Sequence, residues 1–120
     1  MFEIIDIPTF SDDRGSLSVL ESVMPFAIER VYYIYGVQGQ RGGHRHIETR
    51  QAMVCVHGSV DVYMNNGKES KTITLSNPGQ LLIVEPEDWH TMDNFSESAV
   101  LLLLASKTYN PDDYISEPYE

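Results

Sequence analysis

The chain has 120 residues, enough for one domain with a single core and a small pocket. Its formal net charge of -10 argues against general nucleic-acid binding, which requires a basic face. The N-terminus has no basic region or cleavage site typical of a signal peptide, and the longest apolar run, at 99–105, is far shorter than the ~20 residues that cross a bilayer. Cys55 is the only cysteine, which excludes an intrachain disulfide. These features predict a cytoplasmic protein of one domain, residues 1–120, that binds neither nucleic acid nor membranes.

The predicted elements are strands throughout. Residues 2–7 alternate apolar and polar side chains, and residues 28–35 are rich in aromatic and β-branched side chains, both typical of strands. Asn66-Gly67 is a strong short-range hairpin signal, and only residues 109–115 are expected to form a helical turn. Five further strands are predicted at 51–58, 59–64, 69–75, 80–85 and 99–105. Many short strands joined by turns indicate a sandwich or a barrel.

Two histidines, His44 and His46, lie one residue apart inside a cluster of arginines. Alternate residues of a strand point to the same face, so the two imidazoles should share a face and Arg45 should point away from it. Residues 30–50 carry four arginines against one glutamate, in a chain that is otherwise acidic. Because guanidinium groups bind phosphate oxygens in pairs, this local positive charge predicts an anion site.

The strand at 28–35 offers a second polar face. Arg30 and Tyr32 should share one side of it, with Val31 and Tyr33 on the other. If Arg30 and Tyr32 face the same interior as the histidines, the barrel encloses two imidazoles, a guanidinium and a phenol. Buried polar groups cost free energy unless they are paired or used, so such an interior indicates a functional cavity.

The spacing of these residues resembles the two motifs of the cupin superfamily. The matching positions are His44, His46, Gln51 and Gly58 in the first motif, and Gly79, Pro86, His90 and Asn94 in the second. The resemblance implies an all-β cupin fold, a double-stranded β-helix or jelly-roll barrel.

One departure from the cupin pattern bears on metal binding. Gln51 stands where metal-binding cupins have a glutamate, and an amide is a weaker ligand for a cation than a carboxylate. Three histidines, His44, His46 and His90, could still hold zinc or nickel. Without a metal, the two histidines could act as acid and base, because imidazole changes charge near neutral pH.

A set of six segments is similar to the nucleotide-sugar 3,4-ketoisomerases that act on dTDP-4-keto-6-deoxy-glucose, over nearly the whole chain. The segments are DDRGSLSVLE (12–21), PFAIERVYYIYGV (25–37), RGGHRH (41–46), VCVHGSVDVYM (54–64), EPEDWHTM (85–92) and LLLLASKTYNPDDYI (101–115). The resemblance implies a homodimer that binds a thymidine-diphospho-sugar and uses no metal or redox cofactor. It moves the sugar carbonyl from C4 to C3 through an enediol by general acid–base transfer. The product leads to 3-amino-3,6-dideoxy sugars.

The resemblance also implies roles for individual residues. His44 and His46 match the catalytic pair of the family, one as the base at C3 and the other as a proton shuttle between the oxygens, in an order that the sequence leaves open. Tyr32 and Arg30 would orient the sugar or stabilise the enediolate, and Arg41 would hold the diphosphate. The other residues expected to line the pocket are Gln51, His90 and Trp89.

Three other features of the sequence concern the surface of the protein rather than the cavity. Arg45 replaces a small residue and is expected at a subunit interface. Arg14, after two aspartates, is expected in a turn and is a further candidate for substrate contact. The acidic tail at 112–120 is expected to be a solvated terminus.

Three alternative functions remain open at this stage. A 3,5-epimerase acting on a similar nucleotide sugar would leave the ketone at C4. A metal-dependent cupin would use the three histidines as ligands. A non-catalytic cupin would bind the nucleotide sugar without exchanging its C–H protons.

Overall fold

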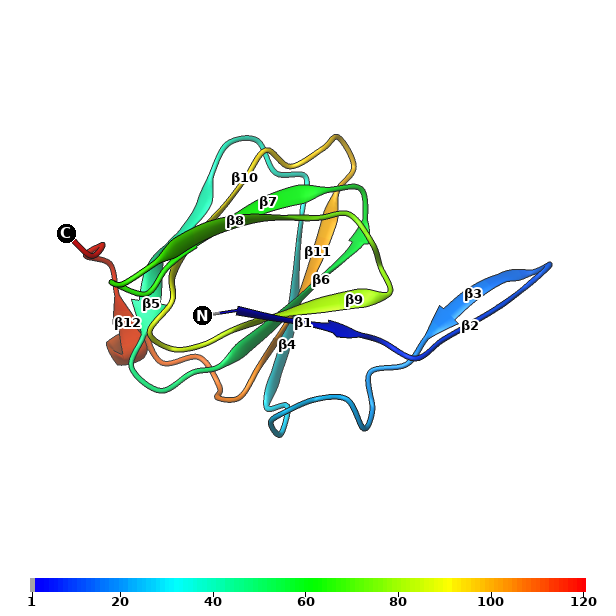
Figure 1. Ribbon diagram of the computed structural model, residues 1–120, viewed down its shortest axis with the longest axis horizontal. Coiled ribbons are helices and arrows are strands. Elements are labelled where there is room, and N and C mark those ends of the chain that lie inside the picture. The colour runs from blue at the N-terminus through cyan, green and yellow to red at the C-terminus, as the bar shows by residue number, and fades with distance from the viewer. Residues whose placement is uncertain (1) are drawn as a thin grey trace.

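The computed structural model describes residues 2–120, which form two five-stranded sheets packed face to face (Figure 1). In the first sheet the strand order is β1-β9-β6-β11-β4, and in the second it is β12-β5-β10-β7-β8. The strands are β1 Phe2–Asp6, β4 Arg30–Tyr35, β5 Arg41–His46, β6 Gln51–His57, β7 Val60–Asn65, β8 Ser70–Leu75, β9 Gln80–Val84, β10 Trp89–Asp93, β11 Val100–Ala105 and β12 Tyr114–Ile115. All pairings are antiparallel. The all-β jelly-roll barrel expected from the sequence is confirmed.

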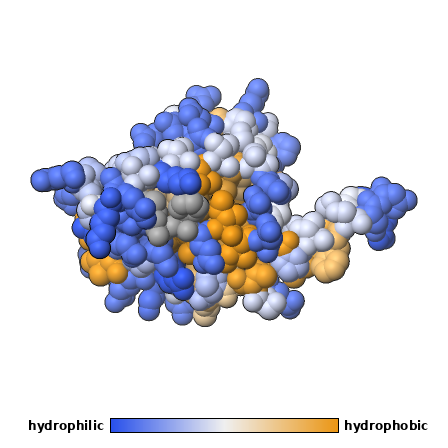
Figure 2. Space-filling view, in the orientation of Figure 1, coloured by the Kyte–Doolittle hydropathy of each residue, from blue (hydrophilic) through white to orange (hydrophobic). Residues whose placement is uncertain are grey.

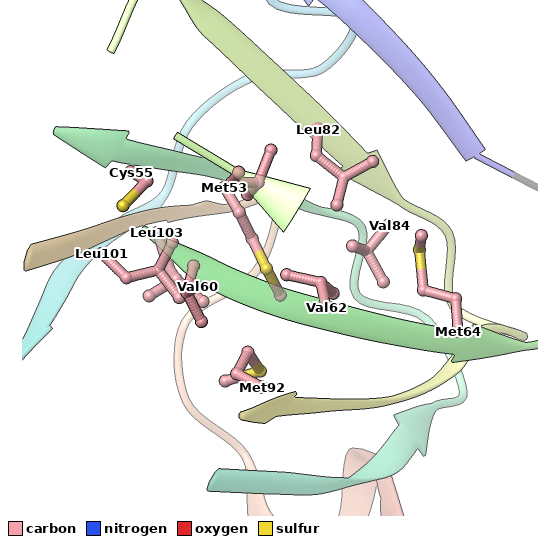
Figure 3. Packing of buried hydrophobic residues seen from close by; sticks show 11 residues of the cluster. Met53, Cys55, Val60, Val62, Met64, Leu82, Val84, Met92, Leu101 and Leu103 are labelled. Carbon is pink, nitrogen blue, oxygen red and sulfur yellow. The ribbon is translucent and has the colours of Figure 1, made fainter. Parts of the chain in front are cut away.

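The main core lies between the two sheets (Figure 3). Its members are Met53, Cys55, Val60, Val62, Met64, Leu75, Leu82, Val84, Met92, Leu101 and Leu103. Burying one such side chain contributes roughly 1.5–3 kcal/mol, so this layer dominates the stability of the barrel. Cys55 is a buried free thiol in this core.

The first sheet is apolar on its outer face as well. Ala52, Val54, Leu81 and Leu104 point away from the barrel interior and are covered in part by residues 20–26. This explains why β6 and β11 are continuous apolar runs rather than alternating ones.

The outer face of β4 has no such cover in the described chain. Val31, Tyr33 and Tyr35 are 59%, 62% and 68% exposed, and the two tyrosine rings stack with their centroids 5.8 Å apart. We call these three residues the β4 patch. The alternation predicted for this strand is therefore confirmed, with Arg30 and Tyr32 on the inner face.

A hairpin arm, formed by β2 (Thr9–Asp12) and β3 (Gly15–Ser18), extends from the barrel as a sheet of its own (Figure 1). Its tip is a turn in which Asp12 accepts hydrogen bonds from the backbone and side chain of Arg14, as expected for a turn at this position. Phe10 and Leu17 on the arm are 66% and 59% exposed. Figure 2 shows an apolar area on this arm beside its hydrophilic tip.

The C-terminal segment is more ordered than predicted. A short 3₁₀ helix, Pro111–Asp113, is capped by the side chain of Asn110 and leads into β12, which pairs with β5. Asp113 is buried and Tyr114 is half-buried. The prediction of a solvated tail is wrong for these residues, because they pack beside the histidine strand.

The strands predicted from periodicity correspond to β1, β4, β6, β7, β8, β9 and β11. The Asn66-Gly67 hairpin is also observed, with a loop at 66–69 between β7 and β8. Within residues 2–120, the structure has no helix with the length and apolar character needed to span a bilayer.

Candidate active site

A cavity of about 200 Å³ opens between the two sheets on the inner face of β4, β5 and β10. It is lined by Arg30, Tyr32, Ile34, Arg41, Gly42, His44, Gln51, His90, Met92, Leu103 and Tyr114. Larger hollows lie along the hairpin arm and near residues 36–39 and 93–98, but no histidine lines them. Of the polar groups expected in the barrel interior, Arg30, Tyr32 and His44 line this cavity, whereas His46 is buried next to His44 and does not line it.

The histidines are brought together by the pairing of β5 with β10. His44 lies directly opposite His90, and the register shifts by one residue just beyond this pair. Gly42 makes the approach of the two strands possible, because a Cβ at this position would lie 2.9 Å from the carbonyl oxygen of His90. Its φ of +87° also favours glycine.

Three imidazole rings form a cluster at the base of the cavity. The ring centroid of His44 is 5.1 Å from that of His46 and 5.0 Å from that of His90. His90 Nδ1 lies 3.0 Å from the carbonyl oxygen of Asp88, and His46 Nδ1 lies 3.0 Å from Asp113 Oδ2. A carbonyl or carboxylate oxygen can only accept, so both neutral rings carry their proton on Nδ1. Both Nε2 atoms are buried without a protein partner and carry a free lone pair.

Burial keeps these imidazoles neutral. It lowers the pKa of His44 to about 4, with a smaller effect in the same direction from His46. Burial lowers the pKa of His90 to about 3. The pKa of His46 is lowered by burial too, but the hydrogen bond and the negative charge of Asp113 act in the opposite direction. At neutral pH the cluster therefore offers basic nitrogen atoms rather than cations.

Tyr32 and Gln51 form the wall opposite the histidines. Gln51 donates a 2.7 Å hydrogen bond from Nε2 to the phenolic oxygen of Tyr32, and its Oε1 has no protein partner. Burial raises the pKa of Tyr32 to about 12, so its hydroxyl keeps its proton. Since the oxygen already accepts from Gln51, the hydroxyl proton of Tyr32 is available to a ligand.

Two arginines give the cavity its positive charge. The guanidinium of Arg30 lies 4.1 Å from the centre of the Tyr32 ring and donates a 3.3 Å hydrogen bond to the hydroxyl of Tyr114. Arg41 lies at the exposed start of β5, on the cavity lining. Arg30 is thus held by its neighbours inside the cavity, whereas Arg41 reaches the solvent.

Sequence reasoning missed two residues of the C-terminal segment. Tyr114 lines the cavity, and its ring contacts those of His44 and His46 at centroid distances of 4.7 and 4.5 Å. Asp113 carries the hydrogen bond to His46. The only signal for either residue was the similarity of residues 101–115 to the ketoisomerases, since nothing in a nine-residue acidic tail predicts that it folds back onto β5.

Trp89 does not line the cavity, contrary to the prediction. It precedes His90 on β10 and so points to the opposite face of the second sheet. There its indole Nε1 donates a 3.1 Å hydrogen bond to the carbonyl oxygen of Ser116, and its ring packs edge-on against Tyr63. Arg45 likewise points away from the histidines, as expected, but its guanidinium lies over the ring of Tyr119, 4.8 Å from the centroid. The chain's own C-terminal tail therefore contacts Arg45.

His44, His46 and His90 are the three histidines that the sequence offered as metal ligands. Within residues 2–120, no group of three or more His, Cys, Asp or Glu side chains is arranged to hold a metal ion. The Nδ1 hydrogen bonds of His90 and His46, to the carbonyl oxygen of Asp88 and the carboxylate of Asp113, fix the orientation of both rings and leave both Nε2 atoms without a protein partner.

Comparison with known proteins identifies the family to which this chain belongs. Residues 1–120 match the family described as FdtA: WxcM-like, C-terminal. The chain is 40% identical over 119 residues to the TDP-4-oxo-6-deoxy-alpha-D-glucose-3,4-oxoisomerase of Aneurinibacillus thermoaerophilus, covering 96% of this chain and 86% of the relative.

Two solved structures show the same fold. A 3,4-ketoisomerase from Helicobacter canadensis is 38% identical, with a TM-score of 0.92 over 97% of this chain and 90% of that one. A His-to-Asn variant of the 3,4-ketoisomerase QdtA from Thermoanaerobacterium thermosaccharolyticum, in complex with TDP-4-keto-6-deoxyglucose, is 36% identical, with a TM-score of 0.94 over 97% and 87% of the two chains. The match over the full chain and these similarities together show that the chain belongs to the FdtA, WxcM-like C-terminal family of cupin barrels.

Proposed function

We propose that this protein is a sugar-nucleotide 3,4-ketoisomerase, which moves the carbonyl of a dTDP-4-keto-6-deoxy-hexose from C4 to C3. The single observation that carries this conclusion is the cluster of neutral imidazoles in a cavity that also presents a phenol and a guanidinium. The identity of 40% to a TDP-4-oxo-6-deoxyglucose 3,4-oxoisomerase supports the same reaction.

The chemistry requires two kinds of group. The ketone at C4 acidifies the hydrogen at C3, so a base within hydrogen-bond reach can remove it to give an enediolate. A proton must then move between the C3 and C4 oxygens, and C4 must be reprotonated. No redox partner is needed, because the substrate carbon that is oxidised and the one that is reduced are neighbours in the same molecule.

We assign the base at C3 to His44 and the proton shuttle to His46. His44 lines the cavity directly, whereas His46 is only 4% exposed and lies behind it on the same face of β5. Both rings are neutral at pH 7 because burial lowers the pKa of each. Each can therefore accept a proton and pass it on.

The other lining residues bind and polarise the sugar. Tyr32 and Arg30 donate hydrogen bonds to the oxygen that becomes negative in the enediolate. Gln51 and His90 orient the ring through the Oε1 and Nε2 atoms that lack protein partners. A cavity of about 200 Å³ is smaller than the ~300 Å³ at which pockets for drug-sized ligands begin, so it encloses the sugar and leaves the nucleotide outside. Arg41, at the exposed rim, then holds the diphosphate.

The protein acts as a homodimer of single-domain subunits. Within residues 2–120 the main core lies between the two sheets, and the β4 patch lies on the outer face of the first sheet. An isolated two-stranded hairpin is marginal in water, and the arm exposes Phe10 and Leu17. A second copy that covers both the β4 patch and the arm would bury these apolar side chains.

The test is an NMR time course in deuterated water with the protein, a chelator and dTDP-4-keto-6-deoxyglucose. A new 3-keto signal with deuterium entering at C3 or C4 is the expected result. Exchange at C3 and C5 with the ketone still at C4 would instead establish a 3,5-epimerase. An unchanged sugar with broadened thymine signals would leave a binding module, and turnover that appears only without chelator would revive the metal-dependent alternative.

A further inference from the structure

Asp113 makes a set of contacts that is more specific than burial of the C-terminal segment requires. Its Oδ1 accepts a 2.8 Å hydrogen bond from the backbone N–H of Glu48. Its Oδ2 accepts a 2.5 Å hydrogen bond from the hydroxyl of Thr49 and lies 3.0 Å from His46 Nδ1. Both oxygens are thus fixed in direction, and one of them is aimed at the imidazole.

The partner of His46 differs in kind from those of the other two histidines. His90 donates to a neutral carbonyl oxygen, and His44 is hydrogen-bonded to the backbone of Gly42. Of the three clustered histidines, only His46 has a carboxylate hydrogen-bonded to its ring. A carboxylate stabilises an imidazolium far more than a carbonyl does, because it carries a full opposite charge.

The carboxylate stays ionised in this position. Burial by itself raises the pKa of Asp113, but the hydrogen bonds from Thr49, from the backbone of Glu48 and from His46 outweigh it and lower that pKa overall. Burial and, to a smaller extent, the positive charge of Arg30 lower the pKa of His46. The hydrogen bond and the negative charge of Asp113 act in the opposite direction and offset part of this effect.

We propose that Asp113, held by Thr49, is a positioning residue for proton transfer: it fixes His46 in the tautomer with hydrogen on Nδ1 and supports the imidazolium formed when Nε2 takes up a proton. The proton comes from one oxygen of the enediol and returns to the other, so the step is balanced and leaves His46 unchanged. This inference rests on the proposed ketoisomerase function, but its first test does not need turnover.

That first test is the tautomer of His46, measured by long-range ¹H–¹⁵N correlation NMR on the ¹⁵N-labelled protein. The wild type should show hydrogen on Nδ1. In Asp113→Asn, the amide presents an N–H where Oδ2 was, so the hydrogen of His46 should move to Nε2. Asp112→Asn is the matched control, because Asp112 is the exposed neighbour on the same 3₁₀ helix, and it should leave the tautomer unchanged.

The second test separates positioning from binding. Asp113→Asn should lower kcat by ~100-fold or more, within the range for loss of acid–base catalysis, while KM changes by less than about threefold. Thr49→Val should lower kcat by ~10-fold, since it removes one hydrogen bond from Asp113, and Thr49→Ser should restore most of the activity. The Thr49 pair also keeps the inference testable if Asp113→Asn does not fold.

The inference is overturned if His46 keeps its hydrogen on Nδ1 in Asp113→Asn, or if that variant turns over at the wild-type rate. Equal kcat values for Thr49→Val and Thr49→Ser would also contradict it. A wild type that binds but never converts the sugar would overturn the proposed function alone, because the tautomer measurement would still decide what Asp113 does.

Discussion

The inner and outer faces of the same strands carry different kinds of side chain and have different surroundings in this molecule. On β4 the inner side chains, Arg30 and Tyr32, line the polar cavity, whereas the outer ones of the β4 patch are apolar and exposed. On β10, His90 points into the cavity while its neighbour Trp89 packs outside against the C-terminal tail. One residue of displacement along a strand therefore decides whether a side chain belongs to the chemistry or to a surface.

This contrast departs from the usual rule that polar side chains face water and apolar ones face the core. The inward polar groups are tolerated because hydrogen bonds partly satisfy them, as between Gln51 and Tyr32. The atoms left unpaired, including Nε2 of His46 and His90, point to a ligand that supplies the missing partner. The outward apolar groups of β4 point to a second protein surface for the same reason.

The largest effect is expected from the inner face of β5. His44→Asn removes the base at C3 and should lower kcat by ~10³-fold, at the upper part of the range for acid–base catalysis. The oligomeric state, measured by sedimentation, should not change. Comparable activity in His44→Asn and the wild type would show that His44 is not the base at C3. The inner face of β5 would then have no greater effect on activity than the outer faces.

On the outer face of β4, Tyr33→Asp should weaken self-association by ~100-fold, because it places a charge in the centre of the β4 patch, next to Tyr35. Sedimentation velocity over a concentration series measures this change. Thr72→Asp introduces the same charge at an exposed position of β8, in the other sheet, and is the control. A dimer that is unaffected by Tyr33→Asp would place the subunit interface elsewhere.

At the inner face of β4, Tyr32→Phe should lower kcat/KM by ~10-fold. The change removes the hydroxyl that can donate to the sugar and leaves Nε2 of Gln51 without its acceptor, while the ring that packs under Arg30 is kept. Steady-state kinetics beside the thermal midpoint would separate the two consequences. A full loss of activity would make Tyr32 a group that transfers a proton to the sugar rather than one that donates a hydrogen bond to the enediolate.

The buried histidines predict a pH dependence of stability with a definite sign. The pKa of His90 is about 3 in the folded protein and ~6.5 in the unfolded chain. As pH falls from 7 toward 4, the unfolded state takes up a proton that the folded state does not, so the free energy of unfolding decreases. Burial raises the pKa of Asp88 to about 6, which opposes this trend between pH 6 and 4.

The comparison that isolates the histidine is therefore a variant. His90→Gln keeps a polar side chain at the cavity without a titrating ring. Between pH 7 and pH 5, its thermal midpoint should fall by a few degrees less than that of the wild type. Parallel curves for the two proteins would show that His90 titrates normally and is not a neutral group of the cavity.

The smallest effect is expected on the outer face of β10. Trp89→Phe should change kcat and KM by less than about twofold, because the indole contacts Ser116 and Tyr63 rather than the cavity. A large increase in KM would contradict the position of Trp89 in the structure and would restore the prediction made from its proximity to His90 in sequence.

Much of the molecule follows from the sequence by itself. Strand periodicity predicted a sandwich or a barrel, and the resemblance to the cupin motifs narrowed this to a jelly-roll barrel. The period of two placed His44 with His46 and Arg30 with Tyr32, since alternation is a local property of extended chain. The composition around residues 30–50 predicted positive charge, and Arg41 lies at the rim of the cavity. The spacing of the second motif brought His90 into the same set.

Only the tertiary structure decided the rest. No strand was predicted at Trp89–Asp93, and its extended conformation depends on pairing with β5 and β7; alternation along it then places Trp89 on the face opposite His90. Asp113 lies 67 residues from His46, and its position depends on a 3₁₀ turn and a two-residue strand that pairs with β5. Such contacts are set by the path of the whole chain, because a hydrogen bond between distant residues leaves no periodic trace in either segment.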